Sequence, residues 1–137
     1  MKDIVLATHG NLSSEFKKTA ELIVGKVPNV HCFGMTKEKS TVQAKAELEA
    51  IIGQFDESNL LVLTDLFGGS ANNICTELLL QGHKFTLLTG LNLPMLLTLL
   101  TSDSDNITTA ELVRQIVAAA QSGVVDVSNR IIEESEK

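Results

Sequence analysis

A histidine and an aspartate each follow an apolar segment that is typical of a β-strand. His9 comes directly after the run Asp3–Thr8, and Asp65 comes directly after Leu60–Thr64. A carboxylate that accepts the Nδ1 proton of an imidazole fixes the tautomer of the ring and leaves Nε2 with a free lone pair. If the two strands are neighbours, the sequence therefore predicts a histidine poised to act as a nucleophile or a base.

Two glycines and a serine follow Asp65 closely. Gly68 and Gly69 let backbone amides approach a bound group, and a helix starting at Ser70 adds unpaired N–H donors and the positive end of its dipole. This pattern favours an anion, and a phosphoryl group is the obvious candidate. We expect its oxygens to be contacted by Thr8, Ser70 and the backbone at Gly68 and Gly69.

Each of these residues also has a simpler interpretation. A histidine at a strand end is more often a hydrogen-bonded rim residue than a catalyst, Asp-Gly sequences favour turns, and Ser70 can act only as a helix cap. The functional interpretation is favoured because the nucleophile follows one strand while the carboxylate and the glycine-rich segment follow another, so the three coincide at the ends of separate strands in one fold. His31, inside a strand pattern, and His83, in a predicted exposed turn, are interpreted as structural.

The order of elements predicts an α/β domain. Apolar runs alternate with segments whose apolar residues recur at helical spacing, which implies right-handed crossovers and a doubly wound, mainly parallel sheet with helices on both faces. In such folds, ligands bind beyond the carboxyl ends of the strands, near the point where the strand order reverses. The segment Gly90–Pro94 also follows a strand at that edge. The predicted strands are Asp3–Thr8, Val30–Met35, Leu60–Thr64 and Phe85–Thr89, and the predicted helix caps are Asn11, Ser40, Ser70, Asn92 and Thr108.

The C-terminal residues predict one more strand and a tail. Val125 and Val127 alternate with polar neighbours, so Val124–Ser128 is expected to form a short, half-exposed edge strand. Such an edge invites pairing with a further strand. Residues 129–137 are expected to form an acidic C-terminal tail, within a single domain that spans residues 1–137.

The composition limits the classes of function. The chain has 137 residues and a formal net charge of −6 with few aromatic residues, which argues against nucleic-acid binding. No apolar run approaches the roughly 20 residues of a membrane span, and no signal peptide is evident, so we expect a cytoplasmic protein. Cys32 and Cys75 are far apart in sequence and are interpreted as reduced packing thiols. We expect neither a metal nor a cofactor.

Three segments of the sequence carry a resemblance to a known family. They are "IVLATHGNLSSEFKKTAELIVG", "VLTDLFGGSANN" and "LLTGLNLPML", and they occur in order over nearly the whole chain. Together they resemble the IIA component of the mannose/fructose/sorbose family of the bacterial phosphoenolpyruvate-dependent sugar phosphotransferase system (PTS). The chain departs from the family's usual GGSP pattern at Ala71, where a helix-starting proline is common.

The resemblance implies a function and a set of partners. In the family, the histidine that matches His9 is phosphorylated and the aspartate that matches Asp65 holds its ring. The phosphoryl group comes from the carrier protein HPr and passes to a histidine of a IIB component, here expected to be a separate chain, which works with the membrane components IIC and IID. Because Asp65 would occupy Nδ1, we expect phosphorylation on Nε2. The resemblance also implies a homodimer in which the final strand joins the sheet of the neighbouring subunit.

Other functions remain as alternatives at this point. A receiver-like regulatory domain would be phosphorylated on Asp65, but it needs an acidic pair after the first strand, where this sequence has Ala7, Thr8 and His9. A hydrolase resembling the histidine phosphatases would carry an arginine directly before the histidine, where this sequence has Thr8. A non-catalytic regulatory domain would keep the fold and the histidine as part of a larger fusion.

Overall fold

The centre of the structure is β3 (Leu60–Thr64), a strand whose five residues are all buried. A continuous run of Leu and Val suits a strand covered by helices on both faces. The computed structural model describes residues 1–136 and places β3 in a four-stranded, all-parallel sheet of order β2-β1-β3-β4. The predicted α/β class and parallel sheet are therefore confirmed. The other strands are β1 (Asp3–His9), β2 (Val30–Met35) and β4 (Thr86–Leu88), the last shorter than predicted.

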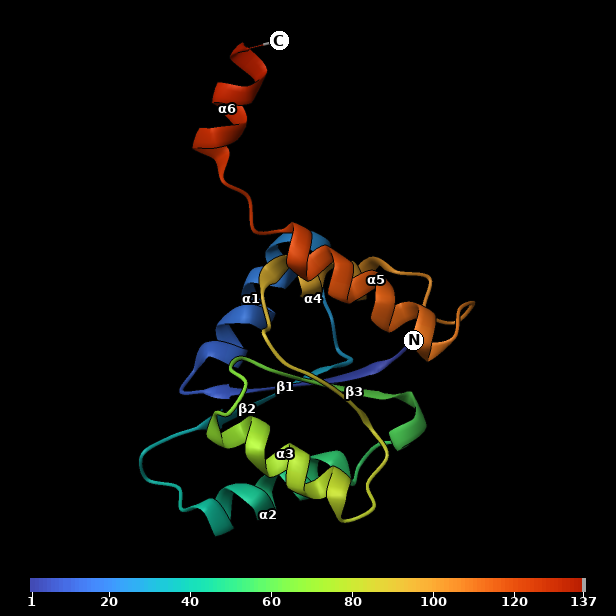
Figure 1. The fold of residues 1–137 in the computed structure, drawn as a ribbon. Coiled ribbons are helices and arrows are strands. Elements are labelled where there is room, and N and C mark those ends of the chain that lie inside the picture. Colours follow the sequence, from blue (N-terminus) through green and yellow to red (C-terminus); the bar gives the residue numbers. More distant parts are fainter. Residues whose placement is uncertain (137) are drawn as a thin grey trace.

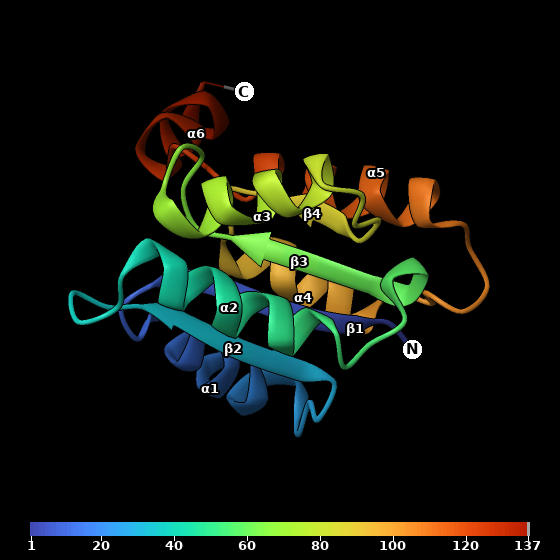
Figure 2. The same ribbon diagram turned by 90° about the horizontal axis from the view of Figure 1, so that it is seen from below.

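Helices cover both faces of this sheet, as the doubly wound pattern predicts. Figure 1 shows α1 (Leu12–Val24), α4 (Leu93–Thr101) and α5 (Thr109–Ser122) on one side. The opposite side carries α2 (Thr41–Ile52) and α3 (Ser70–Leu80), which Figure 2 shows from below. A short 3₁₀ helix, η1 (Glu57–Asn59), precedes β3.

Alternate residues of β1 face two separate hydrophobic cores. Ile4 and Leu6 pack in the core under α1, α4 and α5, whereas Val5 and Ala7 pack in the core under α2 and α3. All four are at most 1% exposed. Because successive side chains of a strand point to opposite faces, both cores fix the position of β1 and hence of His9 at its end.

Most of the predicted helix starts are found in the structure. Ser40 and Gln43 form a reciprocal capping box, Asn92 accepts from the backbone N–H of Met95, and Thr108 caps α5. The prediction for Ser70 is wrong, and the prediction for Asn11 is right only in position, since Asn11 is the N-cap residue of α1. Asn11 makes no side-chain cap, and the N-cap of α3 is Gly69, with Ser70 as the first helical residue. At α1, the hydroxyl of Thr8 takes the place of a cap, since it accepts from the backbone N–H of Ser13 at 2.8 Å.

The predicted C-terminal edge strand is wrong for this structure. Residues 124–126 lie in no strand or helix, and α6 (Val127–Ser135) follows them. The helix starts because Asp126 accepts from the backbone N–H of Asn129 at 2.9 Å, and Asn129 then reaches the carboxylate of Glu133 one turn later. No residue of α6 is buried, and the helix projects from the rest of the domain in Figure 1. Of the predicted acidic tail, Lys137 lies outside the described residues.

His83 connects three segments at the amino end of the sheet, opposite the end at which His9 lies. The Nδ1 atom of His83 lies 2.9 Å from Oε1 of Glu57, and its Nε2 atom lies 3.1 Å from Oε2 of Glu49. Glu57 also accepts from the backbone N–H of Lys84 at 3.1 Å. Hydrogen bonds to Glu49 and then to Glu57 raise the pKa of His83 above its ordinary value. Its side chain is 24% exposed, so the prediction of an exposed turn underestimates how much this residue is covered.

We predict that His83→Gln lowers the free energy of unfolding more at low pH than at high pH. A pKa that is raised in the folded state stabilises the fold fully below the unfolded value of about 6.5, and this contribution is lost as the pH rises through the folded pKa. Urea unfolding at about pH 6 and about pH 9 measures the effect. A difference between wild type and variant that stays constant over this range would contradict the prediction. Lys84→Gln, a neighbouring charge change that leaves the imidazole in place, is the control and should show little pH dependence.

Candidate functional site

His9 and Asp65 meet at the carboxyl end of the sheet, where the strand order reverses. The sheet runs from β1 to β2 on one side and from β1 through β3 to β4 on the other, so the reversal lies between β1 and β3. His9 is the last residue of β1, and Asp65 follows the last residue of β3. The structure thus brings the two together at the place where doubly wound folds bind ligands.

One carboxylate oxygen holds His9 at two points. Oδ2 of Asp65 accepts from the backbone N–H of His9 at 3.1 Å and lies 3.0 Å from Nδ1 of its ring. The first contact fixes the backbone of the residue, and the second fixes the orientation of the ring. The side chain of Asp65 is 14% exposed, whereas that of His9 is 50% exposed. The carboxylate is therefore largely covered, while the imidazole reaches solvent.

The protonation state of the pair follows from the carboxylate. Burial of Asp65 opposes its ionisation, but the hydrogen bonds from the ring and backbone of His9 and from its own backbone outweigh burial, so the pKa of Asp65 lies below its ordinary value. An ionised carboxylate can only accept hydrogen bonds. The neutral ring of His9 must then carry its proton on Nδ1, which leaves the lone pair on Nε2 available.

Gly69 packs directly against the ring of His9. A Cβ atom at this position would lie 2.8 Å from Cε1 and 3.5 Å from Nε2 of His9, and 3.1 Å from the carbonyl oxygen of Leu66. Gly68 precedes it with a φ of +84°, a conformation that favours glycine. Both glycines are therefore required by the turn and by the close approach of the backbone to the imidazole.

The first turn of α3 presents backbone donors at this site. Gly69 is the N-cap, so the N–H groups of Ser70, Ala71 and Asn72 have no acceptor within the helix. The N–H of Gly69 itself is used in the turn, where it donates to the carbonyl of Leu66 at 3.0 Å. The amides without an acceptor in the helix are thus those that follow Gly69, and the anion site predicted here stays a prediction.

The turn from β1 to α1 is fixed by hydrogen bonds of the buried Thr8 and by close packing against β2. Thr8 is fully buried, and its hydroxyl accepts from Ser13 and lies 3.3 Å from the carbonyl of His9. Gly34 on the neighbouring strand has no room for a side chain, because a Cβ would lie 2.2 Å from the carbonyl oxygen of Gly10. The hydroxyl of Thr8 thus already has partners inside the protein. The expected contact of Thr8 with a phosphoryl group stays a prediction.

A buried polar cluster lies behind Asp65, and the sequence did not indicate it. The Oγ1 atom of Thr64 lies 3.0 Å from Oδ1 of Asn72 and 2.8 Å from Oγ1 of Thr89. The carbonyl of Thr64 accepts from the backbone N–H of Leu91 at 3.0 Å. The available signal was a threonine that ends an otherwise apolar strand directly before a site residue.

The segment Gly90–Pro94 reaches the same edge but supplies no reactive group. Leu91 joins it to the end of β3 by the hydrogen bond to Thr64. The side chain of Asn92 is occupied by structural hydrogen bonds, because it accepts from the backbone N–H of Met95 and donates to the carbonyl of Ala120 at 3.0 Å. This segment therefore anchors α4 and α5 to the sheet.

Large apolar side chains close to His9 or Asp65 in the sequence are exposed. Leu66 and Phe67, between Asp65 and the glycines, are 60% and 81% exposed, and Leu12 at the start of α1 is 42% exposed. Exposed large apolar residues beside a reactive group are typical of a protein-binding surface.

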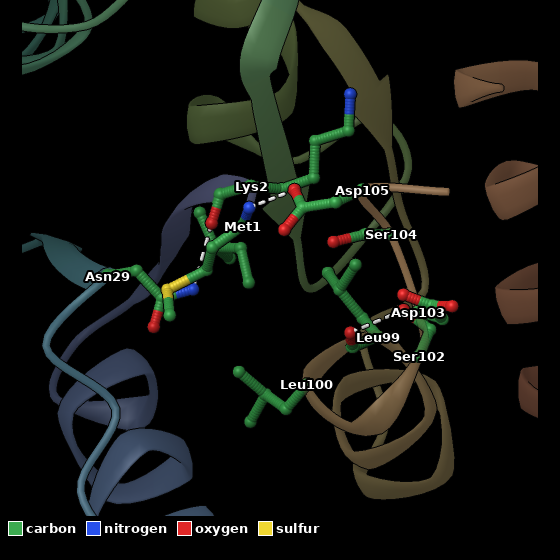
Figure 3. A pocket seen from close by; sticks show the side chains of 10 residues that line it. Met1, Lys2, Asn29, Leu99, Leu100, Ser102, Asp103, Ser104 and Asp105 are labelled. Carbon is green, nitrogen blue, oxygen red and sulfur yellow. Dashed lines mark hydrogen bonds and ion pairs between the residues drawn. The ribbon is translucent and has the colours of Figure 1, made fainter. Parts of the chain in front are cut away.

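A separate cavity of about 210 Å³ lies at the opposite end of β1 (Figure 3). Ile4, Leu99 and Leu100 form its apolar part, and Asp103 and Asp105 lie on its rim. The N-terminal amine pairs with Asp105 there. The cavity is remote from His9, because the first residues of β1 line it and His9 ends the same strand.

Comparisons with known proteins agree with this fold. Residues 3–117 match the family model for the PTS system fructose IIA component. The sorbose-specific EIIA component of Lacticaseibacillus casei is 29% identical over 84% of this chain and 83% of its own length. The crystal structure of a phosphotransferase system component EIIA from Streptococcus agalactiae has a TM-score of 0.83 and 28% identity, and the match covers 94% of this chain and 99% of that one.

A longer relative, the mannose-specific EIIAB component of Escherichia coli strain K12, is 26% identical over 96% of this chain, which spans 41% of that protein. The chain thus has the fold of a phosphotransferase component. It belongs to the mannose/fructose/sorbose family of PTS IIA components, which act in phosphoryl transfer during sugar uptake. Among residues 1–136, no helix is long and apolar enough to cross a membrane.

We predict that Gly69→Ala displaces the imidazole of His9 while the fold persists. The backbone of Gly69 is extended, so alanine can adopt it, but the new methyl group would overlap the ring. Overpacking of this kind costs about 1–3 kcal/mol of stability. Nitrogen-15 shifts of the His9 ring should move away from the wild-type values, because Nδ1 loses its partner. Ser70→Ala removes a hydroxyl at the next position without adding an atom, and it should leave these shifts nearly unchanged.

Proposed function

We propose that His9 carries a phosphoryl group on Nε2, which it receives from a phosphohistidine of HPr and passes to a histidine of a IIB component on a separate chain. The observation that carries the proposal is the contact of Asp65 with Nδ1, because it leaves Nε2 as the free nucleophilic atom. In the first step, the P–N bond of the donor breaks while a P–N bond forms at Nε2. The second step repeats this exchange with the acceptor, so the phosphoryl group is conserved throughout.

The surroundings of His9 support phosphoryl transfer over hydrolysis or aspartate chemistry. Asp65 is largely covered and is occupied by two hydrogen bonds from His9, whereas the imidazole is half exposed. The residue before His9 is the buried Thr8, which supplies no positive charge for a bound phosphate. These features favour the phosphohistidine carrier over the receiver-like and phosphatase-like alternatives.

The phosphoryl oxygens would be received by the start of α3. The free N–H groups of Ser70 and Ala71 and the hydroxyl of Ser70 are the proposed donors, and Gly68 and Gly69 allow the backbone to come close. Ala71 in place of the family's usual proline keeps one more N–H at this position. The helix dipole adds favourable electrostatics for the negative charge.

Exposed apolar residues beside His9 support docking of partner proteins. Transfer between two imidazoles requires close approach and exclusion of water. Phe67 and Leu66 lie next to the site in sequence and can be covered by a partner without rearrangement of the core. HPr and the IIB component, working in the cytoplasm with the IIC and IID membrane components, are the proposed partners.

We predict that His9 is the single phosphorylated residue. Incubation with phosphoenolpyruvate, enzyme I and HPr should add one acid-labile phosphoryl group to the wild type and none to His9→Ala. The variants His31→Ala and His83→Ala are matched controls, and both should be labelled like the wild type. Undiminished labelling of His9→Ala would refute the proposal.

We also propose that the chain forms a homodimer through residues 124–135. Val124, Ile131 and Ile132 are 82%, 64% and 54% exposed, and α6 buries none of its residues on its own domain. An apolar cavity of about 320 Å³ lies at the base of this segment, between the end of β4, α4 and α5, and Val124 lines it. A second copy could cover both the exposed segment and the cavity by exchanging C-terminal segments.

Truncation after Gly123 is predicted to convert the dimer into a monomer. Analytical ultracentrifugation at micromolar concentration measures the change. The double substitution Ile131→Asp and Ile132→Asp keeps the chain length and should also weaken the dimer, since both side chains are exposed in the single chain. A wild-type protein that sediments as a monomer would refute the dimer and leave the chemistry of His9 unaffected.

A further inference from the structure

In the part of the chain that the structure describes, the buried polar side chains all lie at the carboxyl end of the sheet. Among residues 1–136, the polar residues that are buried are Thr8, Ser13, Thr64 and Asn72, each at most 4% exposed. They form two pairs, and each pair joins the end of a strand to the first turn of the helix that follows it. Buried polar groups cost stability unless they are hydrogen-bonded, so their presence only here calls for an explanation.

The first pair consists of Thr8, which directly precedes His9, and Ser13, which follows it in α1. Thr8 accepts from the backbone N–H of Ser13 at 2.8 Å, and the hydroxyl of Ser13 donates to the carbonyl of Phe33 at 3.0 Å. Phe33 is on β2. The peptide that carries His9 is thereby tied to α1 and, through Ser13, to the neighbouring strand.

The second pair consists of Thr64, which directly precedes Asp65, and Asn72, which follows it in α3. Thr64 and Asn72 join the end of β3 to the first turn of α3, and Thr89 extends the cluster beyond the end of β4. The same helix turn begins at Gly69, which packs against the ring of His9. The cluster therefore controls two of the surfaces that confine the imidazole, the carboxylate of Asp65 and the backbone of Gly69.

We propose that Thr8 and Thr64 are positioning residues that hold His9 and Asp65 in the geometry that keeps the ring proton on Nδ1. Neither hydroxyl contacts the ring nitrogens, so both act through the peptides and helix turns to which they are bonded. The catalytic part of this inference rests on the proposed role of His9 in phosphoryl transfer. The structural part, control of the ring by two buried hydroxyls, is measurable in the isolated protein.

The test compares Thr64→Val with Thr64→Ser. Valine keeps the shape of the side chain and removes the hydroxyl, whereas serine keeps the hydroxyl and should restore the wild-type behaviour. Nitrogen-15 shifts of the His9 ring, measured at about pH 9 for every variant, give the fraction protonated on Nδ1. Rapid-quench measurement of phosphoryl acceptance from phosphorylated HPr gives the rate. Asp65→Asn, which presents an amide in place of the carboxylate, marks the values expected for a lost orientation.

We expect Thr64→Val to lower the Nδ1-protonated fraction toward that of Asp65→Asn and to slow phosphoryl acceptance by about 10- to 100-fold, the usual cost of a small misplacement. Thr8→Val should act in the same direction. Ile52→Val, a buried substitution at the far end of α2, is the control for lost stability and should change neither readout. A wild-type tautomer ratio or a wild-type rate in Thr64→Val would overturn the proposal for Thr64, and the same results in Thr8→Val would overturn it for Thr8.

A second variant covers the case in which Thr64→Val does not fold. Thr64→Val combined with Asn72→Leu replaces both buried members of the pair by apolar groups, and only the hydroxyl of Thr89, which is partly exposed, loses a partner. It should show the same loss of Nδ1 protonation, and wild-type values would again overturn the proposal. Failure of the proposed function itself would appear differently, as absence of label in the wild type with the tautomer ratio still sensitive to Thr64.

Discussion

The site depends on a single carboxylate oxygen that binds both the backbone and the ring of one histidine. Oδ2 of Asp65 accepts from the backbone N–H of His9 and contacts Nδ1 of its ring. Two donors converging on one acceptor define the direction of the imidazole and not only its distance. They also keep the carboxylate ionised in a largely covered position, because they lower its pKa against the effect of burial. The electronic state of the ring and its orientation therefore have the same cause.

The rest of the fold serves to bring that oxygen to that residue. Two cores clamp β1 from opposite faces, and β3 lies beside it with every side chain buried. Neither strand can slide by one residue, because a shift would turn apolar side chains from one core toward the other. The register that pairs Ala7 with Thr64 thus sets which residues stand at the rim of the sheet. Membership in the PTS IIA family agrees with this arrangement, since the matched region contains both strands and both site residues.

The sequence predicted those parts of the structure that are determined locally. The run of β3 and the helix caps at Ser40 and Thr108 all follow from residue types within one turn or one strand. The sequence failed where distant groups decide. The cap of α1 comes from Thr8, on the preceding strand, and His83 is covered by two glutamates that are far from it in sequence.

The C-terminal segment shows a different kind of limit. The alternation of Val125 and Val127 is compatible with a strand, but the side chain of Asp126 between them starts a helix. A short pattern of this kind cannot decide between two local structures, and the domain offers it no burial that would decide instead. The contacts around Thr64 were missed for a related reason, because its partners Asn72 and Thr89 come from other elements.

The two halves of the reactive pair are separated by 56 positions along the chain. Closing a loop of this length costs entropy before any contact at the site repays it, and β2, α2 and η1 all lie within it. No fragment that lacks either β1 or β3 can assemble the pair. The environment of His9 therefore forms only when these two central strands associate. In a nascent or partly unfolded chain, the same residue lacks the contact with Asp65 and has no fixed tautomer.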